Sequence, residues 1–409
     1  MEMPDPEGGR EGRPFYVVSG EEIKAGKVVD VYFLRTMETL RRLGLEDTRV
    51  VAEIAARSLP RSRRGGRFEW GVLAGVEEAV RLLEGRNVDL YALPDGSVFE
   101  PGLPVMRIEG PYSEFGPLET SLLGFLCSMS GVATAAAHVK VAAGGKPVVN
   151  FGIRRNHPAI SLAIERAGLI GGLDGSSGIL VEELGFKPVG TMPHALIIIA
   201  GDQVRAWRAF DEAVPEDVPR IALVDTLCDE KTEAIKAAEA LGERLYGVRL
   251  DTPSSRRGRM EEIVREVRWE LDLRGYKQVK IFVSGGLDEV SVESLSRAGA
   301  DAFGVGSRIC GADPVDFGMD VVEVEGEPRA KRGIKSGAKD VFRCPNCLRY
   351  LVLPKGSEPP TCPECGARAE PAYVKFLEGG LLVADLPTTA ELRERTLSQL
   401  RSMGLLPEG

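Results

Sequence analysis

The pattern of apolar and polar residues between residues 145 and 310 is that of alternating strands and helices. Short apolar runs rich in Val, Ile and Phe are separated by amphipathic stretches such as 229–245 and 256–275. Short apolar runs predict buried strands, and helical periodicity predicts helices between them. The predicted strands are residues 146–152, 186–191, 220–226, 246–252, 279–286 and 300–307. This repetition predicts a parallel α/β sheet, and the number of units favours a barrel.

The pattern in the N-terminal part of the chain is different. Residues 88–112 alternate apolar and polar positions between turn-forming residues, which predicts an antiparallel sheet. A long helix predicted over 117–144 connects this sheet to the barrel. We therefore predict an N-terminal α+β domain, an α/β barrel, a small metal-binding module and a C-terminal strand and helix, at residues 15–117, 118–317, 341–370 and 371–409. Strands within 318–343 and 370–386 are expected to complete the N-terminal domain.

Polar residues gather at one end of the predicted barrel strands. In an α/β barrel the carboxyl ends of the strands face one mouth, and active sites are built there. The residues at these ends are Arg154, Arg155, Asp174, Thr191, His194, Asp225, Asp251, Ser284, Gly285, Gly286, Gly304, Gly306 and Ser307. Polar loops after strands are common, but an enrichment at nearly every strand end indicates a functional site.

Two glycine-bearing turns, VSGGLDE (283–289) and FGVGSR (303–308), follow the last two predicted strands. Glycine lets backbone N–H groups approach an anion, and the N-terminus of a following helix adds a positive dipole. Each turn alone is also typical of ordinary loop geometry. Together, at this position in a barrel, they predict a phosphate site formed by Ser284, Gly285, Gly286, Gly304, Gly306 and Ser307.

Other candidate ligand-binding groups surround these turns. Asp225 and Asp251 end neighbouring strands and can hold sugar hydroxyls and Mg²⁺, although Asp225 could instead cap the following helix. Phe151 offers an aromatic face beside the guanidinium groups of Arg154 and Arg155, which suits a flat anionic ring or a diphosphate.

Two further features of the same region depend on a predicted helix start. Ser176 and Ser177 lie at such a start, where hydroxyls and free N–H groups favour a carboxylate. His194 is one of three histidines and precedes another predicted helix. It either forms a local hydrogen bond at the helix start or acts at the mouth of the barrel.

The four cysteines near the C-terminus have metal-ligand spacing. CPNC and CPEC place Cys344, Cys347, Cys362 and Cys365 in two C-x₂-C pairs. Four thiolates in this arrangement predict a closed tetrahedral zinc site with a structural role, and an iron site of the rubredoxin type is the alternative.

The charge distribution gives no support for a nucleic-acid partner. The net charge is −9, from 52 basic and 61 acidic residues without long like-charge blocks. The stretch RSRRGGRFEW (61–70) is the exception, and it suits a phosphate-binding loop or a solvated surface loop equally.

The N-terminus lacks the pattern of a signal peptide, and apolar runs such as 195–200 are shorter than the ~20 residues of a membrane span. We therefore expect a cytoplasmic protein, not a membrane protein, with reduced cysteines.

Several motifs together resemble the nicotinate phosphoribosyltransferases. They are DVYFLRTME (30–38), FGIRRNHP (151–158), GGLDGSSGILVEELGFKPVGTMPHAL (171–196), GVRLDT (247–252), VSGGLDE and FGVGS, and the resemblance covers about residues 20–310. The cysteine module is similar to the C-terminal knuckle domain of short archaeal-type members. The resemblance implies an irregular type II phosphoribosyltransferase α/β barrel, in a homodimer or larger homo-oligomer with active sites near the subunit boundary.

The resemblance also implies a reaction in NAD salvage. Nicotinate and 5-phosphoribosyl 1-diphosphate, accompanied by Mg²⁺, would give nicotinate mononucleotide and diphosphate. Arg154 would contact nicotinate or diphosphate, Asp251 the ribose and metal, and the two turns the 5′-phosphate. Tyr32 would stack on the pyridine across the dimer, opposite Phe151. The remaining residues expected to bind substrate are Arg155, Asp174, Ser176, Ser177, Thr191 and Asp225.

Two positions of the resemblance concern specificity and energy coupling. Members that use nicotinamide have an aspartate where this chain has Ser177, so a serine favours the acid. His194 occupies the position where the family's histidine receives a phosphoryl group from ATP. Pro193 replaces the usual small residue, and the chain is short, so coupling to ATP hydrolysis stays open, as does the choice between a ligase and a simple glycosyltransferase.

Two other functions fit parts of the pattern. A quinolinate phosphoribosyltransferase shares the fold and decarboxylates a diacid, which would need further cations around the second carboxylate. A zinc-ribbon protein that binds nucleic acid on a barrel scaffold would need a basic, aromatic surface, and the acidic total speaks against it.

Overall fold

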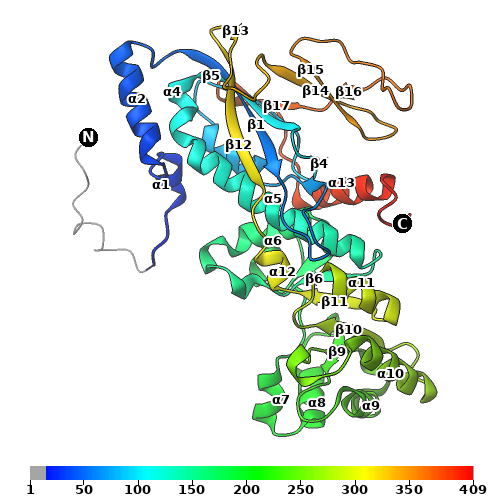
Figure 1. Cartoon of the computed structure of the whole chain (residues 1–409). Coiled ribbons are helices and arrows are strands. Elements are labelled where there is room, and N and C mark those ends of the chain that lie inside the picture. The colour runs from blue at the N-terminus through cyan, green and yellow to red at the C-terminus, as the bar shows by residue number, and fades with distance from the viewer. Residues whose placement is uncertain (1–14, 409) are drawn as a thin grey trace.

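The computed structural model describes residues 15–408, arranged in two lobes joined by one long helix (Figure 1). The upper lobe is built on a seven-stranded antiparallel sheet in the order β13-β12-β1-β5-β3-β17-β18. Its strands are β1 (Arg49–Ser58), β3 (Asp89–Ala92), β5 (Pro104–Pro111), β12 (Asp316–Val324), β13 (Glu327–Pro328), β17 (Val374–Glu378) and β18 (Leu381–Leu382). A two-stranded sheet lies beside it, formed by β2 (Gly71–Val72) and β4 (Val98–Phe99).

The upper sheet contains segments from both ends of the chain. Strand β1 pairs with β5 on one side and with β12, far along the sequence, on the other. Strand β17 pairs with β3. Val50, Ala52 and Ile54 of β1 point into one buried cluster because side chains alternate along a strand. The lobe also contains α1 (Gly20–Lys24), α2 (Val31–Leu43), α3 (Val76–Leu83), α4 (Tyr112–Phe115) and η1 (Gly116–Leu118).

Helix α5 (Glu119–Ala142) connects the two lobes and contributes to both apolar cores. Its small residues allow close packing: a Cβ at Gly131 would lie 2.5 Å from the backbone oxygen of Asp313, and Ser130 Oγ donates to the carbonyl of Ala74 (3.0 Å). The helical stretch 112–142 has the length and apolar composition of a membrane span, but it is mostly buried inside the protein. It is therefore a core helix, longer than the apolar runs noticed in the sequence.

The lower lobe is the predicted α/β barrel in an irregular, open form. Its six parallel strands lie in the order β7-β6-β11-β10-β9-β8, and the edge strands β7 and β8 do not pair with each other. They are β6 (Val148–Asn150), β7 (Gly175–Ser176), β8 (Arg220–Leu223), β9 (Leu245–Leu250), β10 (Lys280–Ser284) and β11 (Ala302–Val305).

One predicted strand is wrong. Residues 186–191 are irregular, and the edge position belongs to β7. Pro188 has no N–H to offer a sheet, and the segment makes a backbone hydrogen bond to β7 only from Val189 N–H to the carbonyl of Ser176 (2.8 Å).

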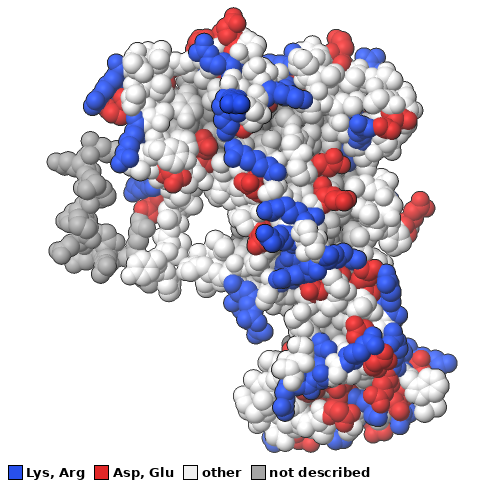
Figure 2. Space-filling model, viewed as in Figure 1, with Lys and Arg blue, Asp and Glu red and all other residues white. Residues whose placement is uncertain are grey.

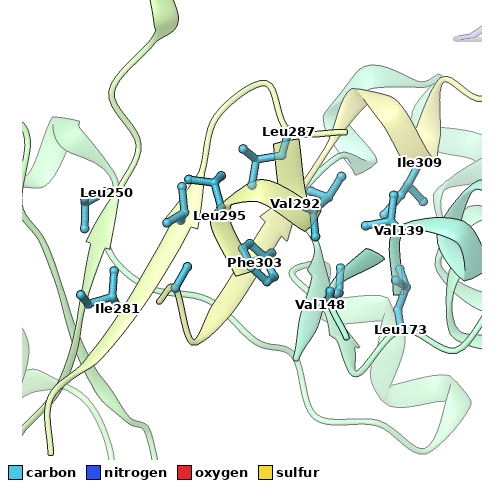
Figure 3. Close-up of a cluster of buried hydrophobic side chains, with 14 of the residues drawn as sticks. Val139, Val148, Leu173, Leu250, Ile281, Leu287, Val292, Leu295, Phe303 and Ile309 are labelled. Atoms are coloured by element: carbon cyan, nitrogen blue, oxygen red, sulfur yellow. The ribbon is translucent and has the colours of Figure 1, made fainter. Parts of the chain in front are cut away.

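The helices of the lower lobe pack around these strands, and one continuous apolar cluster fills the space between them. Figure 3 shows Ile281 and Phe303 of the sheet among Val292 and Leu295 of a covering helix. The helices are η2 (Ile153–Arg155), η3 (Pro158–Ile160), α6 (Ser161–Ile170), η4 (Ile179–Leu184), α7 (His194–Ala200), α8 (Gln203–Ala213), α9 (Glu230–Leu241), η5 (Gly242–Arg244), η6 (Ser254–Arg256), α10 (Met260–Leu273), α11 (Glu289–Ala298) and α12 (Ser307–Cys310).

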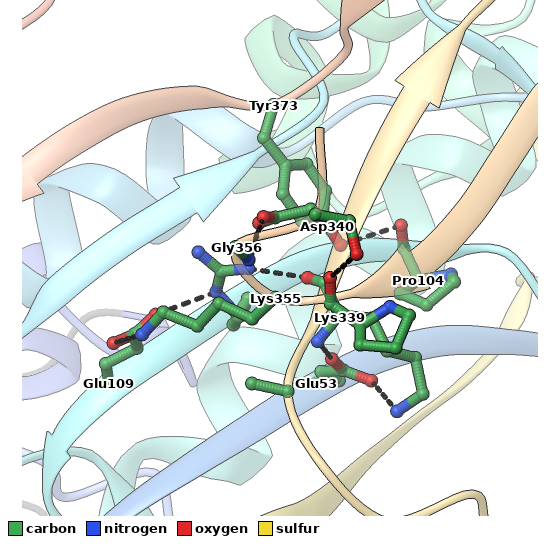
Figure 4. Close-up of polar contacts among 12 residues, drawn as sticks. Glu53, Pro104, Glu109, Lys339, Asp340, Lys355, Gly356 and Tyr373 are labelled. Carbon is green, nitrogen blue, oxygen red and sulfur yellow. Dashed lines mark hydrogen bonds and ion pairs between the residues drawn. The ribbon is translucent and has the colours of Figure 1, made fainter. Parts of the chain in front are cut away.

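The cysteine module docks on the upper sheet through buried charges. It consists of β14 (Lys339–Arg343), β15 (Tyr350–Pro354) and β16 (Glu370–Pro371). Arg107 of β5 is paired with Asp340 of the module (2.7 Å) and with Glu109 (2.8 Å). Glu53 of β1 is paired with Lys339 (2.7 Å). Figure 4 shows this network where the module meets the sheet. Helix α13 (Thr389–Ser402) follows the module and packs against α6.

Candidate active site

A pocket of about 460 Å³ opens at the carboxyl ends of the lower-lobe strands. Parallel strands present these ends on one side, so residues far apart in sequence meet there. Most of the site residues predicted from sequence line it: Phe151, Arg154, Arg155, Ser177, Thr191, His194, Asp251, Ser284, Gly285, Gly286, Gly304, Gly306 and Ser307.

His194 starts helix α7 and lies beside two carboxylates. Its Nδ1 is 3.0 Å from the hydroxyl of Thr226, and its Nε2 is 3.6 Å from Asp251 and 3.9 Å from Asp225. Asp225 Oδ2 accepts from Asp251 N–H (2.9 Å) and from the Thr252 hydroxyl (3.0 Å). Asp225 Oδ1 is buried without a hydrogen-bond partner among the described residues, and burial raises the pKa of this carboxyl.

The two carboxylates meet because β8 and β9 are parallel neighbours that end at the same level. Asp225 is not a helix cap, since Asp229 caps α9. The pair forms a small acidic surface with an imidazole against it. Oxygen atoms in such a surface are the ligands that a hard divalent cation prefers.

The glycine turns have the geometry that close approach to an anion requires. Gly285 and Gly286 have φ values of +91° and +70°, which favour glycine. Ser284 Oγ donates to Asp251 Oδ1 (2.6 Å) and so joins the first turn to the acidic pair. A Cβ at Gly304 would lie 2.3 Å from the Phe151 ring, so the second turn sets the position of that ring.

Arg249 is a pocket residue that the sequence interpretation missed. Its guanidinium donates to the carbonyl of Met192 (3.1 Å) and lies 5.9 Å from the centre of the Phe151 ring. Its Nε is buried without a hydrogen-bond partner, and Arg249 forms no ion pair with any residue in 15–408. Desolvation lowers the pKa of this guanidinium, and the negative charges of Asp251 and Asp225 act against that shift. Alternation along β9 places Arg249 on the same side as Asp251, a signal that was present in the motif GVRLDT.

The other two arginines of the pocket have a different environment. Arg154 and Arg155 lie on the short helix η2 and are exposed to solvent at the rim. They can reach a ligand's phosphate groups, whereas Arg249 is partly buried near the Phe151 ring.

Four residues predicted for the site are not among those that line the pocket. The carboxylate of Asp174 is paired with Lys140 of α5 and Arg393 of α13, at 2.7 Å each. It therefore lies between these two helices. Ser176 is buried and donates to Glu165 (2.9 Å). Tyr32 lies on α2 of the upper lobe with 55% of its surface exposed. Asp225 lies directly behind the pocket, against His194 and Asp251.

The basic loop 61–67 spans the junction of the lobes. Arg63 N–H donates to Glu289 (2.7 Å), which also pairs with Arg308 (2.7 Å), and Arg64 pairs with Glu293. Figure 2 shows Lys and Arg gathered where the lobes meet. These contacts fix the loop on α11, outside the pocket.

The four cysteines of the module come together as predicted. The four Sγ atoms lie within 4.8 Å of one another, close enough to hold one metal ion. The turn after the second pair uses Gly366, whose φ of +75° favours glycine. Four sulfur donors in a compact group fit a tetrahedral Zn²⁺ site.

An antiparallel domain joined to an open parallel barrel, with an anion-suited pocket at the strand ends, defines the class of type II phosphoribosyltransferases. The chain belongs to the quinolinate phosphoribosyltransferase family: the family's N-terminal domain matches residues 30–130 and its C-terminal domain matches residues 132–320. The predicted fold and class of enzyme are therefore confirmed.

Individual relatives extend the likeness to the whole chain. The crystal structure of nicotinate-nucleotide pyrophosphorylase from Pyrococcus furiosus is 53% identical, with a TM-score of 0.92 over 96% of this chain and 99% of that chain. Nicotinate phosphoribosyltransferase from Mycobacterium tuberculosis is 29% identical over 441 residues, covering 96% of this chain and 93% of that protein. Human nicotinic acid phosphoribosyltransferase shares the fold, with 21% identity and a TM-score of 0.73 over 93% of this chain and 95% of that chain.

Proposed function

We propose that the chain is a nicotinate phosphoribosyltransferase, which joins nicotinate to 5-phosphoribosyl 1-diphosphate and releases diphosphate. The observation that carries the proposal is Arg249, a guanidinium with a buried, unpartnered Nε beside the face of Phe151. A planar aromatic acid satisfies both groups, since its ring stacks on Phe151 and its carboxylate pairs with Arg249. The uncharged Ser177 at the same pocket does not repel that carboxylate.

The other pocket residues fit the second substrate. The glycine turns receive the 5′-phosphate through backbone N–H groups, and the exposed Arg154 and Arg155 bind the diphosphate. Departure of diphosphate develops positive charge at the sugar, which Asp251 stabilises from its position next to the first turn. Ser284 holds that carboxylate in place.

A divalent cation fits the acidic pair. Asp225 Oδ1 is buried without a partner, and Asp251 lines the pocket beside it. Mg²⁺ held there would neutralise charge on the diphosphate as it leaves. His194, within 4 Å of both carboxylates, would hydrogen-bond the diphosphate or accept a phosphoryl group.

Nicotinate is favoured over quinolinate by the number of enclosed cations. Arg249 is the partly buried guanidinium of the pocket, whereas Arg154 and Arg155 are exposed at its rim. A second carboxylate on the pyridine would need a second enclosed cation.

The test is a turnover assay with phosphoribosyl diphosphate, Mg²⁺ and one base at a time. Nicotinate mononucleotide should form from nicotinate, while quinolinate and nicotinamide should give no product. Product from quinolinate, with release of carbon dioxide, would assign the chain to the alternative function. Each assay is run with and without ATP to decide whether ATP hydrolysis is coupled.

We further propose a homodimer in which α2 of one copy covers the pocket of the other. Val31, Tyr32 and Leu34 of α2 are exposed, and so are Ile198 and Ile199 of α7 beside the pocket. Mutual burial of these side chains would place Tyr32 opposite Phe151. Mixing a Tyr32→Ala variant with an Asp251→Asn variant should restore activity, since one site in the mixed dimer keeps both residues. No recovery in a confirmed mixed dimer would contradict this arrangement.

We propose that the cysteine cluster binds one structural Zn²⁺. All four cysteines contribute a thiolate, which leaves no position for substrate. Elemental analysis should find one zinc per chain, and Cys362→Ser should lower thermal stability more than the turnover of the protein that remains folded. Iron in place of zinc would assign the rubredoxin type. Free thiols and metal ligands of this kind suit a cytoplasmic enzyme.

A further inference from the structure

A second cavity, of about 820 Å³, lies away from the active-site pocket and shares no lining residue with it. Residues of α1, α3, α5 and α6, the end of η4 and the start of α13 surround it. Its apolar walls are formed by Ile23, Leu82, Phe125, Leu184 and Pro387. A cavity of this size with mainly apolar walls and a few polar groups is typical of a small-molecule site.

Most charged groups of this cavity already have partners. Arg166 is paired with Glu77 (2.6 Å) and with Asp95 (3.4 Å), and Arg81 is paired with Glu84 (3.1 Å). Among the charged groups that are not exposed, Glu78 is the exception. It lines the cavity, forms no ion pair within the described part of the chain, and has a buried Oε2 without a hydrogen-bond partner. A buried carboxylate without a partner is unfavourable, and a cation that enters the cavity relieves it.

Burial raises the pKa of Glu78, and the negative charge of Asp95 raises it further. The nearby Arg166 acts in the opposite direction but is already shared by two other carboxylates. Lys24 and Glu183 are exposed at the rim, where water screens their charges. The enclosed part of the cavity therefore offers one unpaired acidic group next to apolar walls.

Two segments that border this cavity also hold the active-site loop 176–178. Helix α6 contributes Arg166 to the cavity, and the preceding residue, Glu165, accepts from Ser176 (2.9 Å). The 3₁₀ helix η4 begins directly after this loop, and its end at Leu184 borders the cavity. Ser177 in the middle of the loop lines the active-site pocket. A ligand in the cavity therefore touches α6 and η4, the two segments that adjoin the loop 176–178.

We propose that this cavity binds a small organic cation, with an apolar ring system against the walls and a protonated nitrogen on Glu78. Its occupancy shifts the loop 176–178 and changes the affinity of the active site for nicotinate. This second step rests on the proposed function, whereas binding of the cation does not.

The binding step is tested by calorimetry on the full chain with two probes of the same shape. Tryptamine carries a protonated nitrogen and tryptophol a neutral hydroxyl. Tryptamine should bind at least about tenfold more tightly, which corresponds to about 1.4 kcal/mol. Glu78→Gln should remove this preference, while Glu183→Gln, which changes an exposed carboxylate at the rim, should keep it.

Three outcomes would overturn the binding step: no binding of tryptamine, equal binding of the two probes, or an unchanged preference in Glu78→Gln. If a second copy of the chain covers the cavity, tryptamine will not bind, which is the first of these outcomes. The coupling step is tested by titrating nicotinate with and without saturating tryptamine. An unchanged nicotinate affinity would overturn the coupling alone, and a protein that binds tryptamine but not nicotinate would contradict the proposed function instead.

Discussion

Two arginines, one in each lobe, show two uses of a cation inside a protein. Arg107 in the upper lobe is 3% exposed, pairs with Asp340 and Glu109, and lies 4.4 Å from the centre of the Tyr91 ring. Arg249 in the lower lobe forms no ion pair with a described residue and keeps an unpartnered Nε. The first cation has its counter-charges within the chain, so it fastens one part of the molecule to another. The second can obtain its counter-charge from a ligand.

The difference separates structural charges from functional ones. Removing one member of a buried ion-pair network leaves the other members without compensation, which lowers stability. Removing Arg249 takes away its desolvation cost, but it also takes away the ligand's partner and the positive charge that Asp251 and Asp225 face. Stability and activity should therefore respond in opposite ways at the two sites, and the following predictions test this.

The largest effect on stability is expected for Arg107→Met. Asp340 and Glu109 would lose their guanidinium, and a loss of about 3–5 kcal/mol in the free energy of unfolding is typical for breaking such a network. Chemical denaturation measures it. Lys355→Met, which removes the more exposed partner of Glu109, should cost less than about 1 kcal/mol. Equal losses of stability in the two variants would contradict the prediction that the buried Arg107 stabilises the fold more than the exposed Lys355.

The largest effect on activity is expected for Arg249→Met. The value of kcat/KM for nicotinate should fall by about a hundredfold or more, since a charge-assisted bond to the substrate is lost. The melting temperature should change little, because within the described chain Arg249 makes one hydrogen bond, to the Met192 carbonyl, and no ion pair. A clear loss of stability would show that Arg249 is a structural cation like Arg107.

His194→Ala should lower kcat by about a hundredfold, the scale expected when an acid-base or nucleophilic group is removed. Any stimulation by ATP should disappear as well. The matched control is His157→Ala, an exposed histidine that accepts a hydrogen bond from Ala159 N–H (3.2 Å) at the start of a short helix. If the His194 variant keeps normal turnover and its response to ATP, His194 has only a structural role at the start of α7.

Gly304→Ala should raise KM for nicotinate by about tenfold. The new methyl group would meet the Phe151 ring at 2.3 Å and displace it from Arg249. Gly190→Ala is the control, since no atom lies within 4 Å of a Cβ built at that pocket position. Steady-state kinetics compares the two, and similar values of KM would show that the ring position does not matter for the base.

The smallest effect concerns Glu119 in the upper lobe. Burial raises the pKa of its carboxyl to about 7, and the charge of Asp320 adds to the shift. The folded state therefore binds the proton more strongly than the unfolded state. The stability from this proton is complete below the unfolded pKa and is lost as pH rises toward 7. Glu119→Gln should be more stable than the parent by about 1 kcal/mol at pH 8 and similar to it near pH 4. A gap that does not grow with pH would contradict this assignment.

Local patterns in the sequence predicted the strands and the pocket turns well. Strands such as β9 and β10 have mostly buried residues, so they appear as short apolar runs with polar residues after them. The segment 186–191 imitates this pattern, but Pro188 and the short β7 make it an irregular edge. The C-x₂-C pairs predicted a cluster because each pair is local and its ligand chemistry is specific.

Contacts between distant residues could not be predicted in the same way. Asp174 looked like a pocket residue, yet its partners Lys140 and Arg393 are 34 and 219 positions away. Tyr32 lies on another lobe, and its proposed role needs a second copy of the chain. Arg249 could have been predicted as a pocket residue, since it lies two positions before Asp251 and on the same side of the chain. The sequence does not show, however, that this arginine forms no ion pair.

The pairing of β1 with β12 has a consequence for synthesis of the chain. Residues 49–58 find this neighbour only at residues 316–324. Similarly, the Gly96 carbonyl accepts from Gln399 Nε2 and the Val98 N–H donates to Gln399 Oε1, about three hundred positions later. Contacts of such high sequence separation form slowly. On the ribosome β1 therefore stays unpaired on its β12 side until residues 316–324 have been synthesised. An unpaired strand edge is prone to aggregation, so slow translation or a missing chaperone should reduce the yield through the upper lobe.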